Sequence, residues 1–136
     1  MTPWITEPML ADQEACFARA FRHADLETAR PLYDPAVVYY SPTVRLFGWP
    51  ARIEGVDKTL EFIGLTIQHL DAIQYRAVEQ AIVAGAASAF VRIHFDWTGN
   101  GQRLRSNYVV VYRYRGGVIA QQELYYDPSG RLEVLA

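Results

Sequence analysis

The sequence contains a single cysteine, Cys16, so it forms no internal disulfide and has no second thiol with which to build a metal site. It has no run of about 18 apolar residues of the kind that spans a membrane. Its first residues also lack the basic segment and apolar core of a secretory signal. From these absences we expect a soluble, cytoplasmic protein with no membrane partner.

Runs of like charge and strong motifs are missing as well. The 13 Lys+Arg and 15 Asp+Glu residues give a formal net charge of −2, which argues against the basic surface of a nucleic-acid binder. There is no glycine-rich phosphate loop, Gly-x-Ser-x-Gly elbow or Cys-x-x-Cys pair. The three histidines, His23, His69 and His94, fall on separate predicted elements. We therefore expect no nucleic-acid partner, no metal and no other cofactor.

Apolar residues, by contrast, are abundant. Hydrophobic residues make up 51% of the 136 residues and aromatic residues 13%, which is enough for one packed core. No linker, repeat or low-complexity tract divides the sequence. We expect a single domain over residues 1–136.

The clearest local pattern is a β-hairpin near the C-terminus. Two β-rich runs, residues 108–114 and 118–126, flank Gly116 and Gly117, and glycine adopts the positive φ of a tight hairpin turn without steric penalty. Because side chains alternate along a strand, one face of the first run carries Tyr108, Val110, Tyr112 and Tyr114. The second run alternates Gln122, Leu124 and Tyr126 with Glu123 and Tyr125. Alternation alone does not say which face points inward.

The rest of the chain predicts helices followed by strands. A helix from Met9 has an apolar stripe formed by Leu10, Phe17, Ala20, Phe21 and Ala24. The charged residues Asp12, Glu14, Arg19 and Arg22 fall mostly outside this stripe. Further predicted elements are a short helix at 26–32, a strand at 36–41, a helix at 55–70, and strands at 73–84 and 88–97. The predicted order is helix, helix, strand, helix and four antiparallel strands.

Residues 43–54 have no clear period, yet they include Leu46, Phe47 and Trp49 between flexible Gly48 and rigid Pro50. A lid over a pocket or a partner surface would explain these exposed apolar residues. Folding back onto the core explains them equally well.

Several polar side chains are candidates for chemistry in a pocket: Tyr39, Ser41, Tyr108, Tyr112, Gln122, Glu123, Tyr126 and Asp127. A tyrosine can donate a hydrogen bond to a carbonyl oxygen, and a carboxylate against an apolar wall can act as an acid or base near neutrality. The alternative is that the tyrosines are ordinary core residues with hydroxyls at the rim, and that Asp127 before Pro128 caps a turn.

Three stretches together resemble a known family. They are FARAFRHADLETARPLYDPAVVYYSP, GVDKTLEFI and YRYRGGVIAQQELYYDP, and they are similar to the nuclear transport factor 2-like superfamily, especially its SnoaL-like members. The resemblance extends from Leu10 to Asp127. It implies an α+β fold in which N-terminal helices pack in a strongly bent, mostly antiparallel sheet, a cone-shaped barrel around an apolar pocket. It is specific for fold and not for function.

The family's catalytic residues are only partly present. The acids and tyrosine of ketosteroid isomerases correspond to Phe17, Ser41 and Val110. Of the limonene epoxide hydrolase residues only the tyrosine is matched, by Tyr39, and the others correspond to Ser41, Ile93, Phe95 and Leu124. The aspartate of SnoaL-type polyketide cyclases is in rough register with Asp127. The resemblance thus implies Tyr39 as the group that polarises a substrate oxygen, and Asp127 as the proton-transfer group, its pKa raised by an apolar rim.

The resemblance also implies which side chains form the pocket. Registering Gly117 with the family's hairpin glycine turns Gln122, Leu124 and Tyr126 inward and Glu123 outward. The implied pocket residues are Phe17, Ser41, Ile93, Phe95, Tyr108, Val110, Tyr112, Gln122, Leu124 and Tyr126. The implied lid is Leu46, Phe47 and Trp49.

Two functional hypotheses follow. The first is an enzyme that acts without a cofactor on a small, largely apolar molecule, with cyclase, isomerase or dehydratase-like activity. The second is a ligand-binding or dimerisation module with the same pocket and no turnover. In either case we expect a homodimer joined through the outer sheet face, because Phe90, Arg92, His94 and Asp96 mix aromatic and charged groups as interfaces do.

Overall fold

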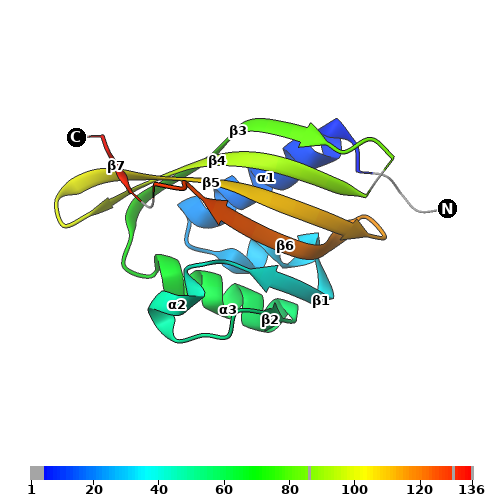
Figure 1. Cartoon of the computed structure of the whole chain (residues 1–136), viewed down its shortest axis with the longest axis horizontal. Coiled ribbons are helices and arrows are strands. Elements are labelled where there is room, and N and C mark those ends of the chain that lie inside the picture. The colour runs from blue at the N-terminus through cyan, green and yellow to red at the C-terminus, as the bar shows by residue number, and fades with distance from the viewer. Residues whose placement is uncertain (1–4, 86, 130, 136) are drawn as a thin grey trace.

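The computed structural model describes residues 5–85, 87–129 and 131–135. The elements in chain order are α1 (Glu7–Arg22), the 3-10 helix η1 (Leu26–Leu32), β1 (Tyr33–Tyr40), α2 (Val44–Phe47), β2 (Ile53–Glu54), α3 (Val56–Ile67), β3 (Asp71–Ile82), β4 (Ser88–Gly99), β5 (Gln102–Arg115), β6 (Val118–Tyr126) and β7 (Glu133–Val134) (Figure 1). The predicted order of helices and strands is confirmed, and α2, β2 and β7 are additional elements that the sequence pattern did not predict.

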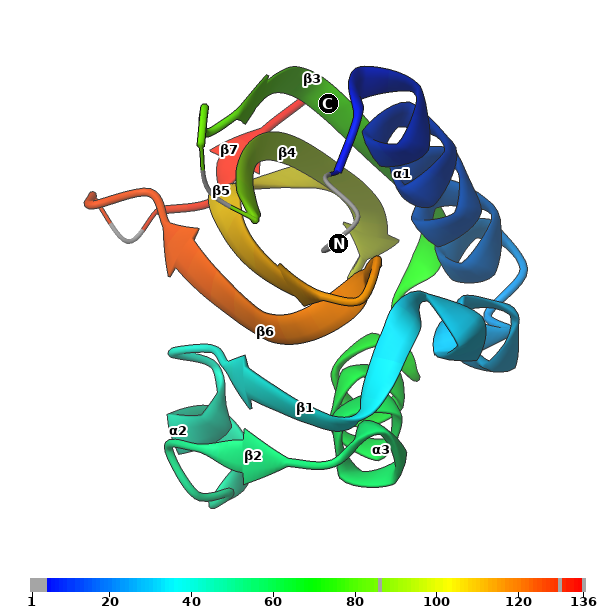
Figure 2. The ribbon, with the colours of Figure 1, turned by 90° about the vertical axis from the view of Figure 1, so that its right-hand side faces the viewer.

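The strands form one mixed sheet in the order β2-β1-β6-β5-β4-β3, with β7 paired to β5. The four strands from β3 to β6 are antiparallel, whereas β1 runs parallel to β6. Figure 2 shows β3 to β6 curling round one side of the molecule, with α1 beside β3 and α3 against β1. The two edge strands, β2 and β3, do not pair, so the sheet is strongly bent but open and is not a closed barrel.

The two ends of helix α1 are set by a side-chain cap at its start and by a change of backbone conformation after its last residue. The Thr6 Oγ1 atom accepts a hydrogen bond from the Met9 amide at 3.3 Å, which satisfies one of the unpaired amides of the first turn. The helix ends at Arg22, two residues before the predicted Ala24, because Ala24 has a φ of 51°. Its buried face packs on β3.

The core lies between the sheet and the two long helices. Its largest fully buried side chains include Leu10 of α1, Phe62 of α3, Ile93 of β4 and Tyr112 of β5. Complete burial of one such apolar side chain stabilises the fold by about 1.5–3 kcal/mol. On β5 the predicted alternation is confirmed, since Tyr108, Val110, Tyr112 and Tyr114 are all buried.

The turn between β5 and β6 fixes how these strands pair. Gly116 and Gly117 have φ values of 59° and 82°, which a side chain would disfavour. The pairing sets Tyr108 opposite Tyr126, Val110 opposite Leu124 and Tyr112 opposite Gln122. Among the described residues, no helix has the length and apolar character needed to cross a membrane.

Candidate functional site

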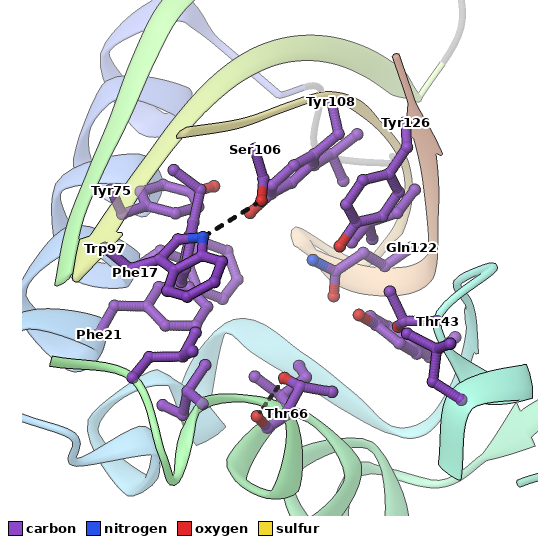
Figure 3. Close-up of a pocket in the computed structure, with 18 of the residues that line it drawn as sticks. Phe17, Phe21, Thr43, Thr66, Tyr75, Trp97, Ser106, Tyr108, Gln122 and Tyr126 are labelled. Carbon is purple, nitrogen blue, oxygen red and sulfur yellow. Dashed lines mark hydrogen bonds between the residues drawn. The ribbon is translucent and has the colours of Figure 1, made fainter. Parts of the chain in front are cut away.

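A cavity of about 440 Å³ lies between the inner face of the sheet and the helices. Its apolar lining comes from Phe17, Phe21, Leu46, Phe47, Ile63, Ile67, Leu70, Phe95, Trp97, Val110, Leu124 and Leu132. Its polar lining comes from Tyr33, Tyr39, Thr43, Thr66, Tyr75, Ser106, Tyr108, Gln122 and Tyr126. Among the described residues, no side chain that lines this cavity is an acid, a base or a histidine. The site therefore offers a largely apolar space with neutral hydrogen-bonding groups (Figure 3).

Gln122 contributes a side-chain amide to the lining of this cavity. It is 6% exposed, and its Oε1 atom accepts a hydrogen bond of 2.6 Å from the Tyr33 hydroxyl. Because the oxygen is engaged, the Nε2 hydrogens are the part of the amide that is available to a ligand. Figure 3 shows the Gln122 amide and the Tyr126 hydroxyl directed into the open space. A ligand with an acceptor oxygen fits this end of the cavity.

Three tyrosines that line the same cavity, Tyr39, Tyr108 and Tyr126, add further donors. Parallel pairing of β1 with β6 sets Tyr39 opposite Gln122, and the rings of Tyr108 and Tyr126 lie 5.0 Å apart. Burial raises the pKa of Tyr39 and Tyr108 well above the ordinary value, and it raises the pKa of Tyr126 to about 12. These hydroxyls stay protonated at neutral pH, so they act as hydrogen-bond donors and not as bases.

A buried carboxyl lies behind one wall of the cavity. Glu14 of α1 is 4% exposed, and its Oε1 accepts 2.6 Å from the hydroxyl of Tyr75, which lines the cavity. Its Oε2 accepts 2.9 Å from the Tyr112 hydroxyl and 3.0 Å from Gln13 Nε2. Burial raises the pKa of Glu14, and the hydrogen bonds from Tyr75, Gln13 and Tyr112 oppose that rise.

Glu14 is a buried carboxyl beside the candidate site that the sequence did not lead us to expect. We placed it mostly outside the apolar stripe of its helix, and the structure shows that this is wrong. The signal was present, because Glu14 lies four residues after Leu10 and three before Phe17, on the same face of the helix. A carboxyl group buried at that spacing needs hydrogen-bond donors from the wall that faces it, and here the wall supplies two tyrosine hydroxyls.

Most of the predicted pocket residues line the cavity. Those found there are Phe17, Phe95, Tyr108, Val110, Gln122, Leu124 and Tyr126, together with Tyr39. Ile93 and Tyr112 are fully buried in the core instead, and α1 covers Tyr112 through its bond to Glu14. Ser41 is buried beside the cavity, where its Oγ lies 2.8 Å from Thr43 Oγ1. Thr43 lines the cavity in its place.

Asp127 does not line the main cavity. Its Oδ1 accepts a hydrogen bond of 2.8 Å from the Ser129 amide, and this contact lowers its pKa. The expectation of a raised pKa is therefore wrong. The geometry is that of an aspartate that caps its own turn, which was the alternative interpretation of Asp127 before Pro128.

The proposed lid residues divide into two groups. Leu46 and Phe47 of α2 line the cavity, and Leu46 is 78% exposed. Trp49 does not line the cavity, since its ring packs 5.2 Å from that of Phe62. Gly48 separates the two groups because its φ of 70° ends α2.

On the outer face of the sheet, one of the four predicted interface residues, Asp96, is buried. Phe90 is 44% exposed and Arg92 is ion-paired with Glu79 at 3.1 Å. Asp96 is 4% exposed, because Arg105 and Arg76 cover it at 2.7 and 3.4 Å. Asp96 is thus neutralised within the chain. Among the described residues, no three histidine, cysteine, aspartate or glutamate side chains cluster in a way that would hold a metal ion.

Comparison with known proteins gives both a family and a fold. The sequence profile of the SnoaL-like domain matches residues 14–122. No curated protein matches the sequence.

Solved structures similar to this one include three that span most of this chain. A protein from Catenulispora acidiphila with a ketosteroid isomerase-like fold, in complex with trimethylamine, has a TM-score of 0.70 and 14% identity over 92% of this chain and 89% of its own. SalBIII, an epoxide hydrolase/cyclase-like enzyme of pyran ring formation in salinomycin, has a TM-score of 0.71 and 14% identity over 95% of both chains. An LEH-like epoxide hydrolase from M. tuberculosis has a TM-score of 0.65 and 16% identity over 88% and 84%. At these identities the likeness shows the fold alone.

Proposed function

Because the chain belongs to the SnoaL-like domain family, which includes cyclases, isomerases and epoxide hydrolases, we propose that its cavity binds the uncharged, largely apolar body of a small molecule. The observation that carries this proposal is the cavity lining, in which neutral donors stand among apolar side chains and no charged group is present among the described residues. Transfer of an unpaired ion into such a site costs several kcal/mol or more, so the cavity selects against charge.

The polar end of the cavity narrows the ligand class further. Its volume of about 440 Å³ suits a molecule of two or three fused rings. Gln122 Nε2 and the hydroxyls of Tyr39 and Tyr126 donate to an acceptor such as a carbonyl or ether oxygen. The ligand is therefore an apolar body with an acceptor oxygen at one end.

A matched series of probes tests the proposal. Binding of 2-acetonaphthone, 2-ethylnaphthalene and 2-naphthoate is measured by isothermal titration calorimetry at neutral pH. The ketone and the hydrocarbon have similar size and shape, so the difference between their affinities measures the contribution of the hydrogen-bond donors. The acid adds a negative charge. We expect the ketone to bind best and the acid worst. Equal affinity of all three, or no saturable binding of any, contradicts the proposal.

A second candidate is catalysis without a cofactor, and the buried Glu14 supports it. In this scheme Tyr39 and Gln122 hold a substrate carbonyl oxygen. Tyr75 accepts a proton from the carbon next to the carbonyl while its own proton passes to the Glu14 carboxylate. The electron pair of the broken C–H bond forms an enolate, which the donors stabilise. Glu14 takes the role that the sequence suggested for Asp127, because Asp127 does not face the main cavity.

Hydrogen exchange distinguishes the two carboxyls. The methyl protons of 2-acetonaphthone are followed by NMR in D₂O. If the chain is an enzyme of this kind, Glu14→Gln and Tyr75→Phe lower the exchange rate about 10²–10⁴-fold, and Asp127→Asn leaves it unchanged. Tyr114→Phe is the matched control, since Tyr114 bonds Gln13 and does not line the cavity. Exchange no faster than in buffer leaves binding as the function.

We further propose a homodimer joined through the outer face of β4, β5 and β6. A shallow hollow there is lined by Phe90, Val109, Val111 and Tyr125, with Arg113 and Glu123 among its polar residues. Phe90 and Tyr125 are 44% and 56% exposed. Paired charges around an apolar centre suit a two-fold contact, in which each group meets its opposite on the partner.

A further inference from the structure

A second hollow, of about 370 Å³, adjoins the main cavity at the exposed side chains of Leu46 and Leu132, where the cavity meets the surface. The two share Thr43, Leu46, Ser106, Tyr126 and Leu132 as lining residues. We call this second hollow the vestibule; its remaining lining comes from Pro42, Arg45, Asn107, Asp127 and Arg131. A ligand that fills the cavity and extends outward passes through the vestibule.

The vestibule differs from the cavity in its charge. Arg45 of α2 and Arg131 before β7 both line it, and Asp127 is its acid. Within the part of the chain that the structure describes, neither guanidinium takes part in an ion pair. The Asp127 carboxylate already accepts a hydrogen bond from the Ser129 amide. Arg45 and Arg131 carry two positive charges and Asp127 carries one negative charge, so the net charge of the vestibule lining is positive.

The positions of these arginines are fixed by local structure. The Arg131 amide donates to Ser129 Oγ at 3.2 Å, and the strand that follows pairs with β5 through Leu104 and Val134. Arg45 lies on the short helix α2, next to Leu46, which lines both hollows. The two arginines thus come from separate segments of the chain that both line the vestibule.

We propose that the vestibule binds a carboxylate carried on a short chain by the molecule whose apolar body occupies the cavity. The planar guanidinium group suits a carboxylate, with which it forms paired, charge-assisted hydrogen bonds. The inference rests on the proposed binding function, and it adds that the natural ligand is amphipathic, with the neutral end inside and the acid at the mouth. In 2-naphthoate the carboxylate is attached directly to the ring system and has no such chain.

A pair of probes that differ only in charge tests this inference. The acid 6-(2-naphthyl)-6-oxohexanoate and its primary amide are titrated by calorimetry at neutral pH and low salt. We expect the acid to bind about threefold to tenfold more tightly than the amide, because two solvent-exposed charges contribute modestly. High salt reduces that advantage. The Arg45→Gln and Arg131→Gln variants each reduce it, and the double variant abolishes it.

Controls separate local charge from net charge. Arg19→Gln removes an exposed arginine of α1 far from the vestibule and leaves the advantage unchanged. Asp127→Asn increases it, because the repelling carboxylate is gone. An acid that binds no better than the amide, or a double variant that keeps the full advantage, overturns the inference while the proposed function stands. If neither probe binds, both are wrong.

Discussion

The Tyr33 hydroxyl and the Oε1 atom of Gln122 lie 2.6 Å apart, although 89 positions separate the two residues. The parallel pairing of β1 with β6 makes this contact possible, because it brings the start of the first strand beside the last long strand. The bond fixes the orientation of the Gln122 amide and leaves its nitrogen free to donate into the cavity. The orientation of the Gln122 donor in the site therefore depends on the pairing of β1 with β6.

Replacing Gln122 should change affinity for the oxygen of a ligand and not for its apolar body. Gln122→Leu keeps a side chain of similar size but removes the donor. We expect the affinity for 2-acetonaphthone to fall about fivefold to tenfold, the worth of one hydrogen bond, and the affinity for 2-ethylnaphthalene to stay the same. Calorimetry measures both. A parallel loss for the two probes would mean that the variant has altered the shape of the cavity instead.

Trp97 should report occupancy of the cavity, and Trp49 should not. Trp97 lines the cavity and donates to Ser106 Oγ at 3.4 Å, whereas Trp49 packs against Phe62. Trp4 lies outside the described residues, so it is replaced by Phe in every sample. We expect ligand-dependent emission to survive Trp49→Phe and to disappear in Trp97→Phe. The reverse pattern would place the ligand beside Trp49 and outside the cavity.

The buried Glu14 should make stability depend on pH. Its folded-state pKa is raised above 4.5, so its contribution to stability is complete below that value and is lost as pH rises through the folded pKa. Glu14→Gln loses one acceptor oxygen and should be about 1–3 kcal/mol less stable at about pH 5. Because Gln does not titrate, this deficit should shrink toward pH 8.

Urea denaturation across that range measures the deficit. The control is Glu7→Gln, which removes the charge of an exposed glutamate on the same helix. A deficit that stays constant with pH would mean that Glu14 has the same proton affinity in the folded and unfolded chains.

The homodimer proposal predicts twice the chain mass in light scattering at micromolar concentration. Phe90→Ser removes an exposed aromatic side chain from the centre of the outer face and should shift the mass toward that of the monomer. Met9→Ser is a matched control, because Met9 is an apolar residue of α1 that is 39% exposed, close to the 44% of Phe90. A wild-type protein that is monomeric at every concentration rules out the interface.

The family resemblance and the α+β fold were predictable because they depend on local patterns. Strand alternation placed Tyr108 and Val110 on a buried face, and the glycine pair marked the hairpin turn. The parallel pairing of β1 was not predictable from such patterns, since it joins segments far apart in the sequence. Whether the cone-shaped barrel closes was not predictable either, because closure depends on whether two edge strands meet, and here β2 and β3 do not.

Alternation along the strands predicted which strand faces line the candidate site, but not which residues of those faces are covered by other elements. Period two placed Tyr108 and Tyr112 on one face, but only the position of α1 decides that Tyr108 lines the cavity and that Tyr112 is covered. Asp127 carried a local turn signal, which proved a better guide to its environment than its register with a family residue. Glu14 was missed because a charged residue on a helix is ordinarily solvated.

The proposed function places the uncharged, largely apolar body of a ligand in the cavity, with the oxygen of the ligand at Gln122. A crystal structure of the protein with 2-acetonaphthone tests it most directly. We expect the naphthalene rings to lie among Phe95, Trp97 and Val110, with the carbonyl oxygen about 3 Å from Gln122 Nε2. An empty cavity in a crystal saturated with the ketone, or a ketone bound only on the outer face of the sheet, would contradict it.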